Sequence, residues 1–207
     1  ECTGQATCRL FAEHPDDSLF HPHFLNEYQA FKVLRFTNWE DFHHSITIAA
    51  GDPALPAPQF AGRSRREHAV WFDIPLEVMV ELANELDAAP WFSIPHHAGD
   101  DYIGDMAALV ARQLDAHLDA YVEYSDSPWV QNRDQYVWSN RQGCLAFAAD
   151  ADSDCLRPGD LEICTPHTQW DEYSGFCQEY GWRYQVQRAA QVIEIWQDAF
   201  SDGERIK

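Results

Sequence analysis

Strands and helices alternate along this chain at a spacing that restricts the fold to a parallel α/β arrangement. Apolar runs typical of buried strands occur at 33–36, 91–95 and 120–125, and a helical pattern follows each of them. The two clearest strand–helix units lie about 30 residues apart, the length of a strand–helix–strand crossover. This order predicts parallel strands with helices packed across them.

The predicted helices have regular apolar spacing and recognisable ends. A short helix is expected at 21–31, and a second one follows Asp73, which we expect to cap it. Asp100 or Asp101 is expected to cap the third helix. A last helix at 178–200 should end at Gly203 and bury the apolar residues Trp182, Val186, Ala189, Ile193, Trp196 and Phe200.

Composition limits the classes of partner. The net charge is −20, with 34 acidic against 14 basic residues. A field of this sign repels nucleic acid and anionic membranes, so neither is an expected partner. No apolar run approaches the ~18 residues of a membrane span. The chain starts at Glu1 rather than Met, which suggests a removed leader or a trimmed terminus, and we expect a secreted or extracellular protein.

Six cysteines favour an oxidising compartment. We expect the three local disulfides Cys2–Cys8, Cys144–Cys155 and Cys164–Cys177, although the other connectivities of six cysteines stay open. The last four crowd one segment, so 130–177 is predicted to be a disulfide-stapled insertion in a single domain at 1–207. A zinc site is disfavoured because no C-x-x-C spacing occurs.

Polar and aromatic side chains follow each predicted strand, where α/β proteins usually place their chemistry. The set comprises Arg35, Asn38 and Trp39 after the first strand, His96 and His97 after the second, and Glu123, Asp126, Ser127 and Trp129 after the third. No Walker loop, G-x-G-x-x-G or G-x-S-x-G motif is present, so nucleotide binding and serine hydrolase chemistry are unsupported.

These strand ends, taken in order, resemble the (β/α)8 glycoside hydrolases of clan A. The quoted motifs are Val33-Leu34-Arg35-Phe36, Ile94-Pro95-His96-His97 and Glu123-Tyr124-Ser125-Asp126-Ser127-Pro128. The chain also resembles secreted bacterial proteins of that type described as cellulose-binding. The resemblance covers residues 20–207, is specific in its order and is weak at each motif. It implies a partial TIM-type barrel, because a full barrel needs ~250 residues, and an open parallel sheet stays the alternative.

The departures from the family pattern decide the expected activity. Ser127 stands where the family has its acid/base Glu, and Asp126 stands where the family has an Asn implied to bind the sugar 2-hydroxyl. The nucleophile of the family lies on a seventh strand, beyond this chain. A serine hydroxyl cannot protonate a leaving sugar near neutral pH. The resemblance therefore implies a non-catalytic protein that binds carbohydrate or has a structural extracellular role.

Two alternatives stay open. Glu123 or Asp126 would be catalytic in an active glycosidase whose remaining strands lie outside this chain. The half-barrel would otherwise be a subunit of an extracellular assembly, with another chain or a missing segment covering its exposed face.

The resemblance makes Arg35, Asn38, Trp39, His96, His97 and Trp129 the candidate sugar-binding residues. Structural interpretations stand beside this one. Arg35 could pair with a carboxylate inside the barrel, and Glu123 faces the right side of its strand to be that partner. The histidines could be structural, and the tryptophans, Trp91 among them, could be core residues.

One acidic run allows a calcium site. Asp150, Asp152 and Asp154 alternate as in the opening of a D-x-D-x-D-G loop. Cys155 replaces the glycine, and Leu161 stands at the position of the closing Glu, so a solvated acidic turn is the competing interpretation. No cofactor is required, and Ca²⁺ is the one candidate ion.

Overall fold

The computed structural model describes residues 19–37, 39, 58–71, 73–130, 134–147 and 174–207. Its centre is a three-stranded parallel sheet in the order β1 (Val33–Arg35), β2 (Ala89–Ile94) and β3 (Tyr121–Tyr124). The α/β class and the parallel strand order predicted from the sequence are confirmed in this part of the chain.

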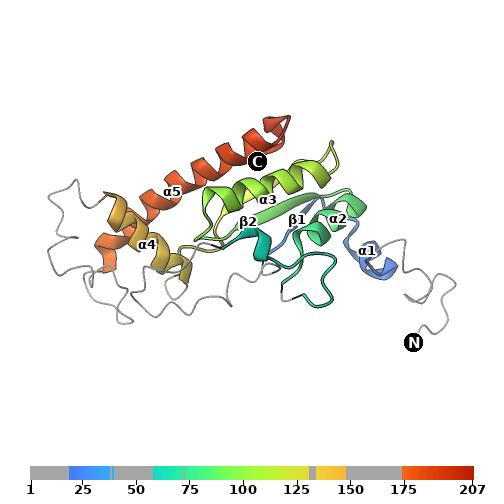
Figure 1. The fold of residues 1–207 in the computed structure, drawn as a ribbon, viewed down its shortest axis with the longest axis horizontal. Helices are drawn as coiled ribbons and strands as arrows, with labels where there is room; N and C mark the ends of the chain where they lie inside the picture. Colours follow the sequence, from blue (N-terminus) through green and yellow to red (C-terminus); the bar gives the residue numbers. More distant parts are fainter. Residues whose placement is uncertain (1–18, 38, 40–57, 72, 131–133, 148–173) are drawn as a thin grey trace.

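Helices follow the strands as the alternation predicts. They are α1 (Pro22–Tyr28), α2 (Leu76–Leu86), α3 (Asp100–Gln113), α4 (Asp134–Phe147) and α5 (Ser174–Ala199), with the short 3₁₀ helices η2 (Phe60–Gly62) and η6 (Gly203–Arg205). Figure 1 shows α3 and α5 side by side on the sheet, with α4 against the first half of α5.

The hydrophobic core lies between one face of the sheet and the helices. Phe92 and Ile94 of β2 and Val122 and Tyr124 of β3 point into it, as period-2 alternation requires. They pack against α2, α3 and α5, and Trp196 of α5 is fully buried beside Phe92. This packing fixes the helices on one side of the sheet.

The opposite face carries different side chains. Arg35, Trp91 and Tyr121 are register partners across the three strands, so they form one row on that face. None of the three belongs to the hydrophobic core. The candidate site is built on this row.

A fourth segment continues the sheet beyond β3. Ile206 forms a parallel bridge with Ala120, and the amide of Val122 donates to the carbonyl of Lys207 at 3.1 Å. The Ile206 side chain is buried in the core. The chain therefore returns after α5 to pair in parallel with β3.

The predicted helix starts need correction. α2 begins at Leu76 with Pro75 as its N-cap, and Asp73 instead accepts a hydrogen bond from the Ser64 hydroxyl. α3 is capped by Gly99 rather than by Asp100 or Asp101, which form its first turn. The carboxylates of Asp100 and Asp101 still lie at the N-terminus of α3, where the helix dipole favours negative charge.

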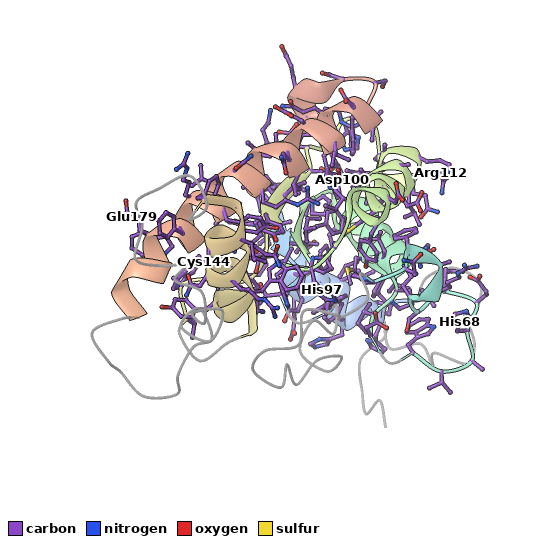
Figure 2. The ribbon with its side chains drawn as sticks, turned by 60° about the vertical axis from the view of Figure 1, so that its left-hand side comes forward. His68, His97, Asp100, Arg112, Cys144 and Glu179 are labelled. Atoms are coloured by element: carbon purple, nitrogen blue, oxygen red, sulfur yellow. The ribbon has the colours of Figure 1, made fainter. Side chains whose placement is uncertain are left out.

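The segment at 130–177 is partly helical, which the sequence analysis did not predict. It contains α4 and the first residues of α5. Cys144 of α4 is disulfide-bonded, and the side chains of the other five cysteines are not among the described ones, so the proposed pairing with Cys155 stays a prediction. Figure 2 shows Cys144 on α4 beside α5.

The predicted burial of the last helix is wrong in its first half. Trp182 is 56% exposed and Val186 is 73% exposed, whereas Val192 and Trp196 are buried as core residues. The first half of α5 packs against α4, which turns Gly181 rather than Trp182 inward. Gly203 begins η6 and does not terminate α5, which ends at Ala199.

Among the described residues, no helix combines the length and apolar composition needed to cross a bilayer.

Candidate functional site

The Glu123 carboxylate is the centre of a hydrogen-bonded network on the face of the sheet opposite the hydrophobic core. We call this the open face. One of its oxygens, Oε1, accepts from Arg35 Nε at 2.9 Å, from Arg35 Nη2 at 2.6 Å and from Ser93 Oγ at 2.6 Å. The three residues come from β1, β2 and β3, and strand alternation places all of them on this face. The network therefore links all three strands.

Asp126 extends the network from the turn after β3. Its Oδ1 accepts from Arg35 Nη2 at 3.3 Å and from Ser127 Oγ at 2.8 Å. The flanking Ser125 and Ser127 have positive φ of 67° and 53°. This backbone conformation is unusual without glycine and often marks functional turns. The turn directs the Asp126 carboxylate back to the strand ends.

Two aromatic rings lie beside this network. The Arg35 guanidinium lies 5.1 Å from the centroid of the Trp91 ring, and Trp91 stacks on Tyr121 with centroids 5.8 Å apart. A core role was one interpretation of Trp91 from the sequence, and the structure places Trp91 outside the hydrophobic core, on the opposite face of the sheet. A charged network next to aromatic faces is a common arrangement in sites that bind polar rings.

His96 and His97 form a second group after β2. Their rings lie 4.7 Å apart, and both face the Trp138 ring of α4. Burial lowers the pKa of His97, so its imidazole is neutral near pH 7. Figure 2 shows His97 next to α4.

Tyr124 and Arg188 hold this second group in place. The Tyr124 hydroxyl donates to the backbone carbonyl of His96, and burial raises the pKa of this phenol, so it keeps its proton as a donor. Arg188 of α5 donates to the Ala98 carbonyl at 3.1 Å and pairs with Asp100 at 2.7 Å. The loop after β2 is thereby anchored to α5.

The predicted site residues do not all come together in the structure. Arg35, Glu123 and Asp126 meet on the open face, and the histidines form the neighbouring group. Trp39 packs on Phe36 at the edge of the core with ring centroids 5.0 Å apart, and Trp129 is 63% exposed past the turn. The remaining predicted positions lie outside the described residues or have side chains outside them, and they are Asn38, Asp150, Asp152, Asp154, Cys2, Cys8, Cys155, Cys164 and Cys177.

Sequence reasoning missed Ser93 and Tyr121. A signal for both was available, because period-2 alternation puts Ser93 on the face of Trp91 and Tyr121 on the face of Glu123. The cross-strand contacts of Ser93 with Glu123 and of Tyr121 with Trp91 depend on the register, which a single sequence does not fix.

No metal-binding group was found in the described ranges, where no three His, Cys, Asp or Glu side chains gather suitably. The three aspartates of the calcium hypothesis lie outside the described residues.

The arrangement gathers charged groups that can bind a polar ligand. Both carboxylates face the Arg35 guanidinium. The network offers fixed donors and acceptors beside aromatic faces. Such groups can recognise hydroxyl-rich ligands.

Comparison of this chain with protein-family models, with curated proteins and with solved structures gave no match.

Proposed function

We propose that this protein is an extracellular, glycoside hydrolase-like domain that binds carbohydrate without cleaving it, built as a partial TIM-type barrel. The observation that supports this proposal is the Arg35–Glu123–Ser93 network, which spans three parallel strands beside the Trp91 and Tyr121 rings. Fixed polar groups next to aromatic faces suit a sugar, which has hydroxyls at its rim and C–H groups on its ring faces.

The proposed lack of hydrolysis rests on the turn after β3. Ser127 stands at the position of the acid and donates to Asp126, so its hydroxyl serves the network. Glycoside hydrolysis needs two carboxyl groups on opposite sides of the scissile bond. Glu123 and Asp126 instead share one arginine nitrogen.

An aryl glycoside with a good leaving group is the fair test, because it bypasses the general acid. We expect no turnover of such substrates and an increase in melting temperature with a soluble neutral glycan. Turnover that Asp126→Asn abolishes would assign a catalytic role to Asp126 and refute the proposal. Absence of both turnover and a thermal shift would also refute it and would leave the assembly hypothesis as the better one.

A second candidate is an active clan A glycosidase whose remaining strands lie outside this chain. The parallel pairing of Ile206 with Ala120 favours it, because this pairing extends the sheet in the sequential order of a barrel. The intact mass of the native protein tests this candidate. A mass well above 23.8 kDa supports it, and a mass equal to that value contradicts it.

A further inference from the structure

The sheet has an unpaired edge at β1. The carbonyl of Lys32 and the amide of Phe36 form hydrogen bonds with β2, at 2.9 Å and 3.1 Å. Backbone groups alternate in direction along a strand, so the N–H and C=O groups of Val33 and Arg35 point away from β2. In the part of the chain that the structure describes, no backbone group pairs with this outer edge. Such an edge is a template for a further strand.

An apolar groove of about 270 Å³ lies beside this edge, between β1, α1 and α2. Its lining side chains are aliphatic or aromatic apart from Arg35, and they include Phe24 of α1, Leu34 of β1 and Leu82 of α2. Figure 1 shows α1 next to α2. The volume is below the roughly 300–1,000 Å³ of sites that enclose a drug-sized molecule, so it suits the side chains of a larger partner.

The rim of the groove exposes apolar side chains. Phe31 is 54% exposed, Tyr28 is 40% exposed and Val33 is 38% exposed. The Tyr28 ring lies 4.6 Å from that of Phe24 and 5.8 Å from that of Phe31, centroid to centroid, so these aromatic residues form one continuous surface. Apolar side chains that are grouped in this way mark an interaction site, whereas scattered ones do not.

The edge and the groove together specify the kind of occupant. Unpaired N–H and C=O groups of a strand are satisfied by an extended backbone, and alternate side chains of that backbone point to one face of the sheet. A second copy of this chain is disfavoured, because two chains of net charge −20 repel each other. The same field attracts a segment that carries basic residues.

We propose that the β1 edge binds an extended segment of another protein by strand addition. This segment is apolar at alternate positions and basic at its ends. Its backbone pairs with Val33 and Arg35, and an apolar side chain enters the groove between α1 and α2. The inference goes beyond carbohydrate binding and does not depend on it.

A capped synthetic peptide of about eight residues, a usual strand length, tests strand addition on the full chain. It carries Val and Phe at alternate positions, Thr between them and Lys at both ends. The control is the same peptide with methylated backbone amides, which cannot donate to β1. We expect the unmethylated peptide to bind at least about tenfold more tightly in calorimetry, because only its backbone can pair with the edge.

Hydrogen exchange followed by NMR shows where the peptide binds. Exchange of the Val33 and Arg35 amides should slow by about fivefold or more when the peptide is added, because a strand then covers them. The amide of Val122 already donates to the carbonyl of Lys207, so its exchange should stay unchanged.

Phe31→Ser and Trp182→Ser form a matched pair of variants. Both are exposed aromatic residues, at 54% and 56%, but Trp182 belongs to the first half of α5, which Figure 1 shows away from α1. We expect Phe31→Ser to weaken peptide binding about tenfold and Trp182→Ser to change it by less than about twofold. Val33→Pro removes one outward donor at an edge position that tolerates proline, and it should weaken binding about fivefold. Circular dichroism checks that the variants are folded.

Four outcomes would overturn the proposal. They are equal binding of the methylated peptide, unchanged exchange at Val33 and Arg35, equal weakening by Phe31→Ser and Trp182→Ser, and no binding at about 1 mM peptide. Sedimentation that shows a dimer abolished by Val33→Pro would assign the edge to a second copy and would also overturn it. Glycan binding is measured on the same sample, so the failure of either proposal is seen separately.

Discussion

The guanidinium of Arg35 joins β1 to β3 across β2, which lies between them. Its Nε and Nη2 both donate to Glu123, and Ser93 of the middle strand donates to the same oxygen. Hydrogen bonds to a charged group that also have favourable geometry are stronger than neutral ones. These hydrogen bonds therefore connect the three strands, in addition to forming a candidate binding surface.

A double-mutant cycle with Arg35→Met and Glu123→Gln measures the coupling free energy between these two side chains. Arg35 is 39% exposed, so solvent screening limits the coupling, and we expect about 1 kcal/mol in the free energy of unfolding. The control cycle is Arg66→Met with Glu81→Gln, where Arg66 is 50% exposed and we expect about 0.3 kcal/mol. Urea denaturation gives both values. Equal coupling in the two cycles would show that the network adds nothing beyond a surface ion pair.

The half-buried His97 should make the protein less stable in mild acid. Its folded pKa lies below the unfolded value of 6.5, so protons bind the unfolded chain more readily. Its contribution is therefore complete above pH 6.5 and is lost as the pH falls from there toward the lower folded pKa. We expect His97→Gln to flatten the fall in melting temperature between about pH 7 and pH 5.

The exposed His68 provides the control for this experiment. His68→Gln should leave the pH profile unchanged. A profile that stays steep in His97→Gln would contradict the role of His97.

At the scale of elements, the crossing of α4 and α5 depends on two glycines. A Cβ on Gly143 would lie 2.2 Å from the carbonyl oxygen of Tyr180, and a Cβ on Gly181 would lie 2.0 Å from Asn140 Oδ1. The first clash is with backbone, which cannot move without shifting the helix. Gly143 therefore sets the distance between the two helices.

Gly143→Ala should lower the free energy of unfolding by about 2 kcal/mol, because overpacking outweighs the gain in helix propensity. Gly104→Ala in α3 is the matched control, since the nearest atom to its Cβ would be Ile195 Cγ2 at 4.0 Å. We expect this control to stabilise the protein by about 0.5–1 kcal/mol. Thermal and urea denaturation measure both changes, and a stabilised Gly143→Ala variant would contradict the close helix crossing.

The elements differed in how far the sequence predicted them. Val122 and Tyr124 alternate with Glu123 and Ser125, so the buried face of β3 followed from period 2. The presence of β2 was also predicted, but the outward direction of its Trp91 side chain was not. α4 did not follow from the sequence, because the cysteines of this segment predicted a disulfide-stapled insertion, and the reason for Gly143 lies in another helix. Local patterns do not contain such tertiary contacts.

The candidate site, too, could be predicted only in part from the sequence. Its position after the strands followed from the parallel order, and the pairing of Arg35 with Glu123 was one of the interpretations given for them. The positive φ of Ser125 and Ser127 could not be predicted, because no glycine or asparagine marks those positions.

At the scale of the whole molecule, the charge of −20 lowers stability through self-repulsion. Salt screens this repulsion, so the melting temperature should rise by a few degrees between about 0.05 and 0.5 M NaCl. Neutralising Asp105 and Glu194, which are exposed on α3 and α5, should reduce this response to salt. A melting temperature that falls with NaCl would show that attractive ion pairs dominate instead.

The parallel bridge between Ala120 and Ile206 also affects the folding and unfolding kinetics. The two segments are separated by α4, α5 and the long connection between these helices, so their pairing closes a large loop. Loop closure of this size is entropically costly and slow, and we expect the pairing to form after the β2–β3 unit. Ile206→Val should then accelerate unfolding in stopped-flow experiments and leave the refolding rate almost unchanged. The bridge would then form late in folding, and its stability would determine the unfolding rate and so the lifetime of the folded protein.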